Sequence, residues 1–311
     1  GTATMAILLV KLTGLPESWT TPLMVVFGFG FCITAFIGYK GLEMLSRFAV
    51  PAMIILVAVS MTIATSDAGG FSGLLAITPS DEMTVAAAIT MVFGTFVSGG
   101  TQATNWTRFA KSGKTAVIAT LLAFFLGNGL MTLIGAFGAL VYQQADIVDI
   151  MVAQGLATLG ILMLFLNLWT TQDNTVYNFA VAGCNMIRTR RRKLVTVGGA
   201  AIGTVLAVLG MYEWLIPFLV LLGTFIPPIG GVIMASYFIG YKREYPSLET
   251  ATLPAFNVPG LAAYAIGSAA AYTSPWIAPI VGVLVAAASY GVVLVVSEAV
   301  RDRRAQVLGA V

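Results

Sequence analysis

The stretch 156–186, LATLGILMLFLNLWTTQDNTVYNFAVAGCNM, carries a row of polar side chains inside an otherwise apolar segment. Spacings of three, four, seven and eleven residues place five of them on one face of a helix: Asn167, Thr170, Thr171, Asn174 and Asn178. The segment is long enough to cross a bilayer, where amides and hydroxyls are costly unless they face protein, water or a ligand. The row therefore predicts an interior polar surface, which is either a site for an ion or solute or a set of helix–helix hydrogen bonds.

The composition of the chain is that of a polytopic membrane protein. Hydrophobic residues make up 58% of its 311 residues and charged residues only 9%, and the mean hydropathy is +0.92. Soluble domains contain nearly three times that share of charge. We expect residues 1–311 to form a single transmembrane domain. The net charge of +3 is too small to indicate a nucleic-acid partner.

Histidine is absent from the sequence. This absence excludes histidine general acid–base chemistry, Ser–His and Cys–His nucleophilic pairs, and histidine-ligated metals. The two cysteines, Cys32 and Cys184, lie in apolar segments without the spacing of metal ligands. We therefore expect no enzyme and no resident cofactor.

Nine apolar segments are candidates for membrane-spanning helices, which need about 20 residues. They cover residues 22–39, 45–65, 85–106, 116–142, 156–186, 194–210, 215–237, 260–272 and 276–296. A shorter apolar stretch, 1–10, precedes them and is only half long enough to span.

The basic residues fall in every second loop between these segments. They are Lys40 and Arg47, then Arg108, Lys111 and Lys114, then Arg188, Arg190, Arg191, Arg192 and Lys193, then Lys242 and Arg243, and finally Arg301, Arg303 and Arg304. By the positive-inside rule these loops and the C-terminus are expected to be cytoplasmic. The first full span must then start outside, so the stretch 1–10 is interpreted as the end of an earlier helix. We expect the sequence to be a fragment that lacks earlier membrane helices.

Two of the spans contain clusters of helix-breaking residues. One is GTFVSGG at 94–100 and the other is GTFIPPIGG at 223–231. Glycine costs about 1 kcal/mol and proline about 3 kcal/mol in a helix interior, so both spans are expected to kink or unwind there. Unwound backbone at membrane depth is typical of substrate sites in secondary transporters. For Gly127, Gly129, Gly135 and Gly138 we expect close helix packing instead.

Asp173 is the one carboxylate well inside a predicted span. It lies about 120° from the centre of the polar row at 100° per residue. This position argues against a direct ion ligand and favours a structural or supporting role.

The sequence resembles bacterial members of the nucleobase–cation symporter family, also called the purine-cytosine permease family. The matching segments, in family order, are GTFVSGGTQATNWTRFAK at 94–111, FFLGNGLMTLIGAFG at 124–138, MVAQG at 151–155, NLWTTQDNTVY at 167–177 and IPPIGGVIMASY at 226–237. The resemblance covers essentially the whole chain. It implies an all-α membrane protein with the leucine-transporter fold, built from inverted repeats with broken helices. An intact member has twelve helices, so about the first two and a half would be missing here.

The resemblance also implies a secondary active transporter that imports cytosine with sodium by alternating access across the bacterial inner membrane. Phe96 would stack on the nucleobase, while Ser98, nearby unwound backbone and Gln172 would hydrogen-bond its ring. Asn167, Thr170 and Thr171 would supply oxygens to sodium, the coupling ion.

Three alternatives stay open at this point. The first is a transporter of the same fold for a purine, hydantoin or allantoin, because this chain has Gln172 where the cytosine-transporting members have Asn. A membrane-embedded enzyme is disfavoured because no nucleophile–base pair can be assembled. A channel would need a polar lining across several helices, whereas the polar residues concentrate near mid-depth.

Overall fold

The structure, a computed structural model, describes residues 2–78, 83–144, 147–247 and 256–308, and within these ranges every regular element is a helix. The chain divides into two compact units. The first consists of Gly1–Asp81 and Arg108–Trp214, and the second of Glu82–Thr107 and Leu215–Val311.

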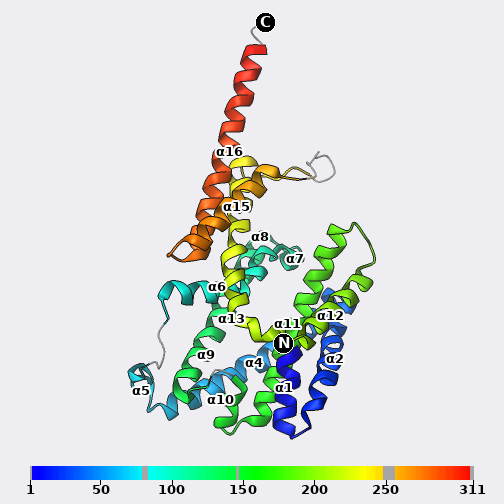
Figure 1. Ribbon diagram of the computed structural model, residues 1–311, viewed down its shortest axis with the longest axis vertical. Helices are drawn as coiled ribbons and strands as arrows, with labels where there is room; N and C mark the ends of the chain where they lie inside the picture. The colour runs from blue at the N-terminus through cyan, green and yellow to red at the C-terminus, as the bar shows by residue number, and fades with distance from the viewer. Residues whose placement is uncertain (1, 79–82, 145–146, 248–255, 309–311) are drawn as a thin grey trace. The chain divides into compact units, whose positions relative to one another are not determined.

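The first unit contains most of the helices (Figure 1). They are α1 (Thr2–Thr13), η1 (Glu17–Trp19), α2 (Thr20–Gly30), α3 (Ile33–Ile37), α4 (Tyr39–Asp67), α5 (Phe71–Ala76), α8 (Gly113–Leu121), the π-helical η2 (Leu122–Asn128), α9 (Gly129–Tyr142), α10 (Ile147–Ala153), α11 (Ala157–Met186), α12 (Arg192–Val208) and η3 (Met211–Trp214).

The helix α11 lies at the centre of this unit. It packs against α12, α4, α10, α3 and α1, and α12 in turn packs against α2. One core cluster joins Ala35 of α3, Leu42 of α4, Tyr177 of α11 and Ala200 of α12. The helix that carries the polar row is therefore surrounded by neighbours on several sides.

The second unit contains α6 (Val85–Thr101), α7 (Thr104–Thr107), α13 (Leu215–Phe225), α14 (Pro227–Ala235), the π-helical η4 (Ser236–Gly240), α15 (Val258–Thr273) and α16 (Ala278–Leu308). Both α14 and α15 pack along α16, and α13 packs against α6. The long α16 is the red helix in Figure 1.

The prediction of an unwound segment at 94–100 is wrong, because α6 is helical from Val85 through Thr101. A Cβ on Gly94 would overlap the carbonyl oxygen of Leu219, and a Cβ on Gly223 would overlap that of Thr90. The two helices thus cross antiparallel with their backbones in contact. These glycines permit close approach between helices rather than breaking them.

The second predicted break is confirmed. The helix α13 ends at Phe225 and α14 begins at Pro227, so Ile226 interrupts the span. Pro227 and Pro228 cannot donate backbone hydrogen bonds to the preceding turn, which accounts for the interruption. A further break, which the sequence did not predict, lies at Phe31 and Cys32 between α2 and α3.

Three of the four glycines expected in close packing are not packed closely within the first unit. A Cβ on Gly127, Gly129 or Gly135 would meet nothing within 4 Å, whereas one on Gly138 would lie 2.9 Å from Cδ1 of Ile150. Gly127 instead lies in the π-helical turn η2.

Each of the nine predicted spans overlaps one or more helices. Among the described residues, six helical stretches are long and apolar enough to cross a membrane: Glu17–Ile37, Tyr39–Asp67, Val85–Thr107, Gly113–Tyr142, Met211–Gly240 and Ala278–Ser297. The helices α12 and α15 are shorter, with 17 and 16 residues. The helix α11 has the length, but its polar row lowers its hydropathy.

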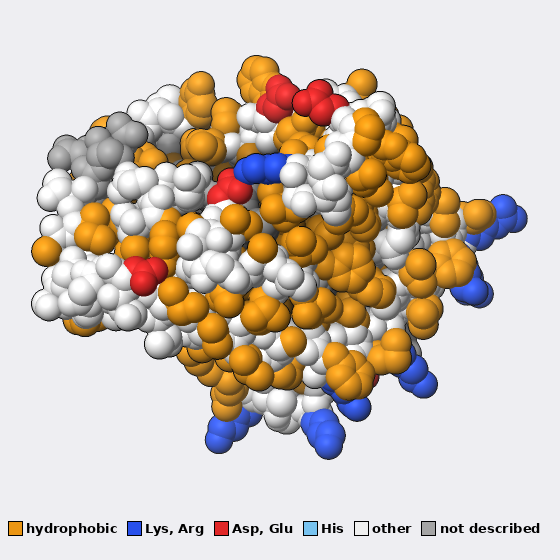
Figure 2. Space-filling view, turned by 90° about the horizontal axis from the view of Figure 1, so that it is seen from below, with side chains coloured by type: hydrophobic (Ala, Val, Ile, Leu, Met, Phe, Trp, Pro, Cys, Tyr) orange, Lys and Arg blue, Asp and Glu red, His pale blue; other side chains and the backbone are white. Residues whose placement is uncertain are grey.

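Large hydrophobic side chains are exposed on many of these helices, including Phe48 at 76% and Phe125 at 77%. They cover much of the face shown in Figure 2, where Lys and Arg side chains project at its margin. Such a surface suits a protein that is surrounded by lipid.

Candidate functional site

The polar row on α11 changes in exposure along its length. Asn167, Thr170 and Asn174 are half-buried, Thr171 is exposed and Asn178 is buried. Asn174 donates its side-chain amide to the carbonyl oxygen of Thr170, at 3.1 Å. The row is thus a strip of amides and hydroxyls along α11 in which Asn174 is linked to Thr170 one turn before it.

The Thr170 hydroxyl donates its proton to its own helix and keeps its acceptor lone pairs. Its proton is directed back to its own helix, with Oγ1 lying 3.0 Å from the carbonyl oxygens of both Leu166 and Asn167. A hydroxyl has one donor and two acceptor lone pairs, so the lone pairs of Thr170 point away from the helix backbone. This arrangement fits an oxygen ligand of a hard cation.

The other two predicted sodium ligands are near Thr170 on the same helix. Asn167 lies one turn before it, and Thr171 follows it directly. Among the described residues, no group of three His, Cys, Asp or Glu side chains gathers as a metal-binding cluster. Amide and hydroxyl oxygens such as those of this strip suit a hard cation better than a soft transition metal.

Gln172 lies beside α12. Its Nε2 is 4.0 Å from the position that a Cβ would take on Gly203 of that helix.

Asp173 joins α11 to α3. It is 1% exposed, and it accepts a hydrogen bond from the hydroxyl of Thr34. Trp169 donates its indole N–H to the same hydroxyl, at 3.1 Å. Asp173 therefore lies on another face than the polar row and ties two helices together, which agrees with the structural role predicted for it.

Phe96 presents its ring on the surface of the second unit. The side chain is 40% exposed on α6. A Cβ on Gly99 would lie 2.9 Å from Cε1 of Phe96, so the ring lies over Gly99, one turn along the helix. The missing side chain at Gly99 lets the ring lie along α6, where it forms a flat platform.

Ser98 follows on the same helix and is half-buried. Its carbonyl oxygen accepts hydrogen bonds from the Thr101 hydroxyl, at 2.9 Å, and from the Gln102 amide, at 3.2 Å. The expectation that unwound backbone binds a ligand here is wrong, because this backbone is helical. The interruption lies later, between the end of α6 at Thr101 and the start of α7 at Thr104.

The predicted residues belong to different units. Asn167, Thr170, Thr171 and Gln172 lie on α11 of the first unit, and Phe96 and Ser98 lie on α6 of the second.

Sequence reasoning missed three residues that support these surfaces. Thr34 holds Asp173, Gly99 underlies Phe96, and Arg192 donates to the carbonyl oxygens of Ala35, Phe36 and Ile37 at the end of α3. The spacing of three between Phe96 and Gly99 is a signal that could have been read from the sequence. The partners of Thr34 and Arg192 are distant in the chain and carry no such signal.

Comparison with known proteins identifies relatives over nearly the whole chain. Residues 1–293 match the family described as permease for cytosine/purines, uracil, thiamine, allantoin. Curated cytosine permeases from Escherichia coli O157:H7 and from Escherichia coli strain K12 are each 38% identical over 290 residues, which is 93% of this chain and 68% of theirs.

A solved structure also matches. The structure titled "Inward facing conformation of Mhp1" superposes with a TM-score of 0.71 at 18% identity, covering 96% of this chain and 70% of that chain. The fold is therefore that of Mhp1, which is the leucine-transporter fold expected above.

Proposed function

Because the chain belongs to the family of permeases for cytosine/purines, uracil, thiamine and allantoin, we propose that it imports cytosine together with sodium by alternating access. Proteins of this family are membrane transporters of nucleobases and related compounds, not enzymes. The observation that carries the proposal is the 38% identity to curated cytosine permeases across 93% of the chain. The side chains on α6 and α11 supply the chemistry that such a transporter needs.

The ring of Phe96 supports a flat aromatic cargo. A nucleobase has a π-face, and stacking on an aromatic side chain recognises that face without reading its edge. Ser98 offers a hydroxyl two residues away, and Gln172 offers an amide from α11. Hydrogen-bonding groups of this kind read the donor and acceptor pattern of a base.

The polar strip of α11 supports sodium as the coupling ion. Thr170 holds its hydroxyl proton against the helix and leaves its lone pairs for a cation, and Asn167 and Thr171 add an amide oxygen and a second hydroxyl beside it. Oxygen ligands near the middle of a span are typical of sodium-coupled transporters.

Gln172 supports a second candidate, a transporter of another heterocycle such as a purine, hydantoin or allantoin. The side chain is one methylene longer than Asn, and its amide nitrogen lies 4.0 Å from the position of a Cβ on Gly203. A shifted amide would read a different edge of the cargo.

We place the protein in the bacterial inner membrane with its C-terminus in the cytoplasm. The alternation of basic and neutral loops supports this orientation.

The test is uptake of labelled cytosine by proteoliposomes that contain the full-length protein, with an imposed inward sodium gradient. We expect cytosine accumulation that collapses when sodium is replaced by choline at constant pH. Unlabelled cytosine should compete best among cytosine, uracil, hypoxanthine, hydantoin and allantoin. Uptake driven by a proton gradient alone would contradict sodium coupling, and stronger competition by another compound would assign the cargo to the second candidate.

A further inference from the structure

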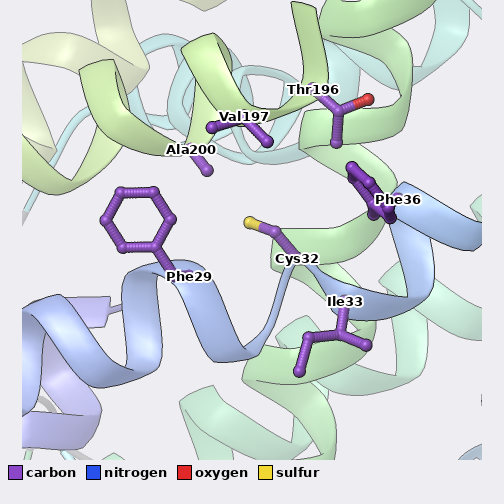
Figure 3. A pocket seen from close by; sticks show the side chains of 7 residues that line it. All are labelled: Phe29, Cys32, Ile33, Phe36, Thr196, Val197 and Ala200. Atoms are coloured by element: carbon purple, nitrogen blue, oxygen red, sulfur yellow. The ribbon is translucent and has the colours of Figure 1, made fainter. Parts of the chain in front are cut away.

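The first unit contains an apolar cavity of about 170 Å³ between the α2–α3 break and α12 (Figure 3). Its lining residues are Phe29, Cys32, Ile33, Phe36, Thr196, Val197 and Ala200. Cys32, Thr196 and Ala200 are buried and form its floor. Its rim is exposed: Ile33 is 58% exposed and Val197 is 45% exposed.

The cavity lies where the helical span is interrupted between α2 and α3. At Gly28 a Cβ would overlap the Thr204 hydroxyl, so α2 and α12 touch there. The helix then ends at Gly30, and α3 begins at Ile33. The gap lies between this break and Ala200 and Thr196 of α12, one and two turns from the contact with Thr204.

The walls of this cavity have no free polar group to offer a ligand. The Cys32 thiol donates to the carbonyl oxygen of Gly28 at 3.0 Å, and the Thr196 hydroxyl donates to that of Arg192 at 2.9 Å. An apolar cavity of this size does not hold ordered water. It also cannot pair with the edge of a nucleobase, so its walls do not suit the cargo proposed above.

Positive charge lies at one end of the cavity. The Lys193 ammonium lies 5.0 Å from the centre of the Phe36 ring, which lines the cavity. Arg188, Arg190 and Arg191 are exposed in the preceding turn. Arg192 donates to three carbonyl oxygens of α3, which fixes the end of the cavity beside Phe36.

We propose that this cavity binds one acyl chain of an anionic phospholipid, whose phosphate is held by Lys193. A cavity with an apolar lining and an exposed rim in a membrane-spanning unit faces lipid tails, so an acyl chain can fill it. Tails alone give little selectivity, because every lipid supplies them. The basic end supplies the selectivity, since basic residues beside a span attract anionic headgroups.

The test is native mass spectrometry of the full-length protein after detergent release from bilayers with equal amounts of phosphatidylglycerol and phosphatidylcholine of the same acyl chains. We expect one phosphatidylglycerol to be retained in preference to phosphatidylcholine. Val197→Trp should fill the mouth of the cavity and abolish retention of this lipid. Lys193→Gln should lower retention about fivefold.

Matched controls lie on the same unit. Val205→Trp changes another exposed valine of α12 outside the cavity, and Lys114→Gln removes another exposed basic residue. Both should retain phosphatidylglycerol as the unmodified protein does. The thermal midpoint of each variant verifies that it is folded.

Equal retention of the two lipids would overturn the proposal. So would unchanged retention in a folded Val197→Trp variant, because the lipid would then bind elsewhere. A Val197→Trp variant that loses stability while keeping its lipid would indicate that a protein segment, not an acyl chain, fills the cavity.

Discussion

At the scale of single residues, Phe96 and Gly99 form a pair on one face of α6, where the ring lies over the glycine. Phe96→Ala removes the platform, so we expect cytosine binding to weaken by about 1–3 kcal/mol, the range for loss of a base–aromatic stack. Phe96→Tyr should have a smaller effect. Equilibrium binding to the purified full-length protein measures this, with Phe93→Ala, another exposed phenylalanine of α6, as the control. Unchanged affinity in folded Phe96→Ala would remove the ring from the site.

Gly99→Ala tests the orientation of the ring without removing it. The new Cβ would lie 2.9 Å from Cε1 of Phe96, so the ring must tilt away from the helix. We expect weaker cytosine binding than in the unmodified protein, with no loss of helix stability because alanine favours helix over glycine. Gly100→Ala, at an exposed neighbouring glycine, is the control. If Gly99→Ala binds cytosine normally, the ring orientation does not matter for binding.

A substitution at Thr171 tests the proposed ion site on α11. Thr171→Ala should shift the sodium dependence of cytosine uptake to higher concentration while changing binding little at saturating sodium. Coupling between two ligands is typically worth about 1–3 kcal/mol and is reciprocal, so cytosine should also enhance sodium binding less in this variant. Thr175→Ala is the control, because Thr175 is an exposed threonine of the same helix that lies outside the polar row. An unaltered sodium titration would exclude Thr171 as a ligand.

At the scale of helices, the crossing of α6 and α13 depends on Gly94 and Gly223. Each glycine faces a carbonyl group of the other helix, so an added methyl group must push the helices apart. Overpacking of this kind costs typically about 1–3 kcal/mol. We expect Gly94→Ala to lower the thermal midpoint of the full-length protein in detergent.

The control for this prediction is Gly230→Ala in α14, where a Cβ would meet nothing within 4 Å. That variant should keep or raise the midpoint. Equal midpoints for the two variants would mean that the close contact of α6 and α13 does not contribute to stability.

At the scale of the whole molecule, the orientation in the membrane can be tested with single cysteines. In a background with Cys32→Ser and Cys184→Ser, Ser66→Cys should react with a membrane-impermeant maleimide in intact cells. Arg190→Cys should react only after permeabilisation, because the basic loop is expected in the cytoplasm. Both positions are exposed in the structure. The reverse pattern of labelling would invert the proposed topology.

The sequence alone determined the class of protein, the helical character of the predicted spans, the polar row of α11, the family and a break within residues 223–231. These follow from local properties. Hydropathy, the 100° step of a helix and the missing N–H of proline act within a few residues, so no knowledge of neighbouring helices is needed.

The tertiary structure alone decided what the glycines do. Glycine both weakens a helix and lets another backbone approach, and the outcome depends on whether a second helix is present at that position. The carbonyl group of Leu219 lies against Gly94, and α6 stays helical at that position. No such neighbour lies beside Gly127 in the first unit. The partners of Asp173 and Arg192 were hidden for the same reason, because residues more than 130 positions apart meet only after the chain has folded.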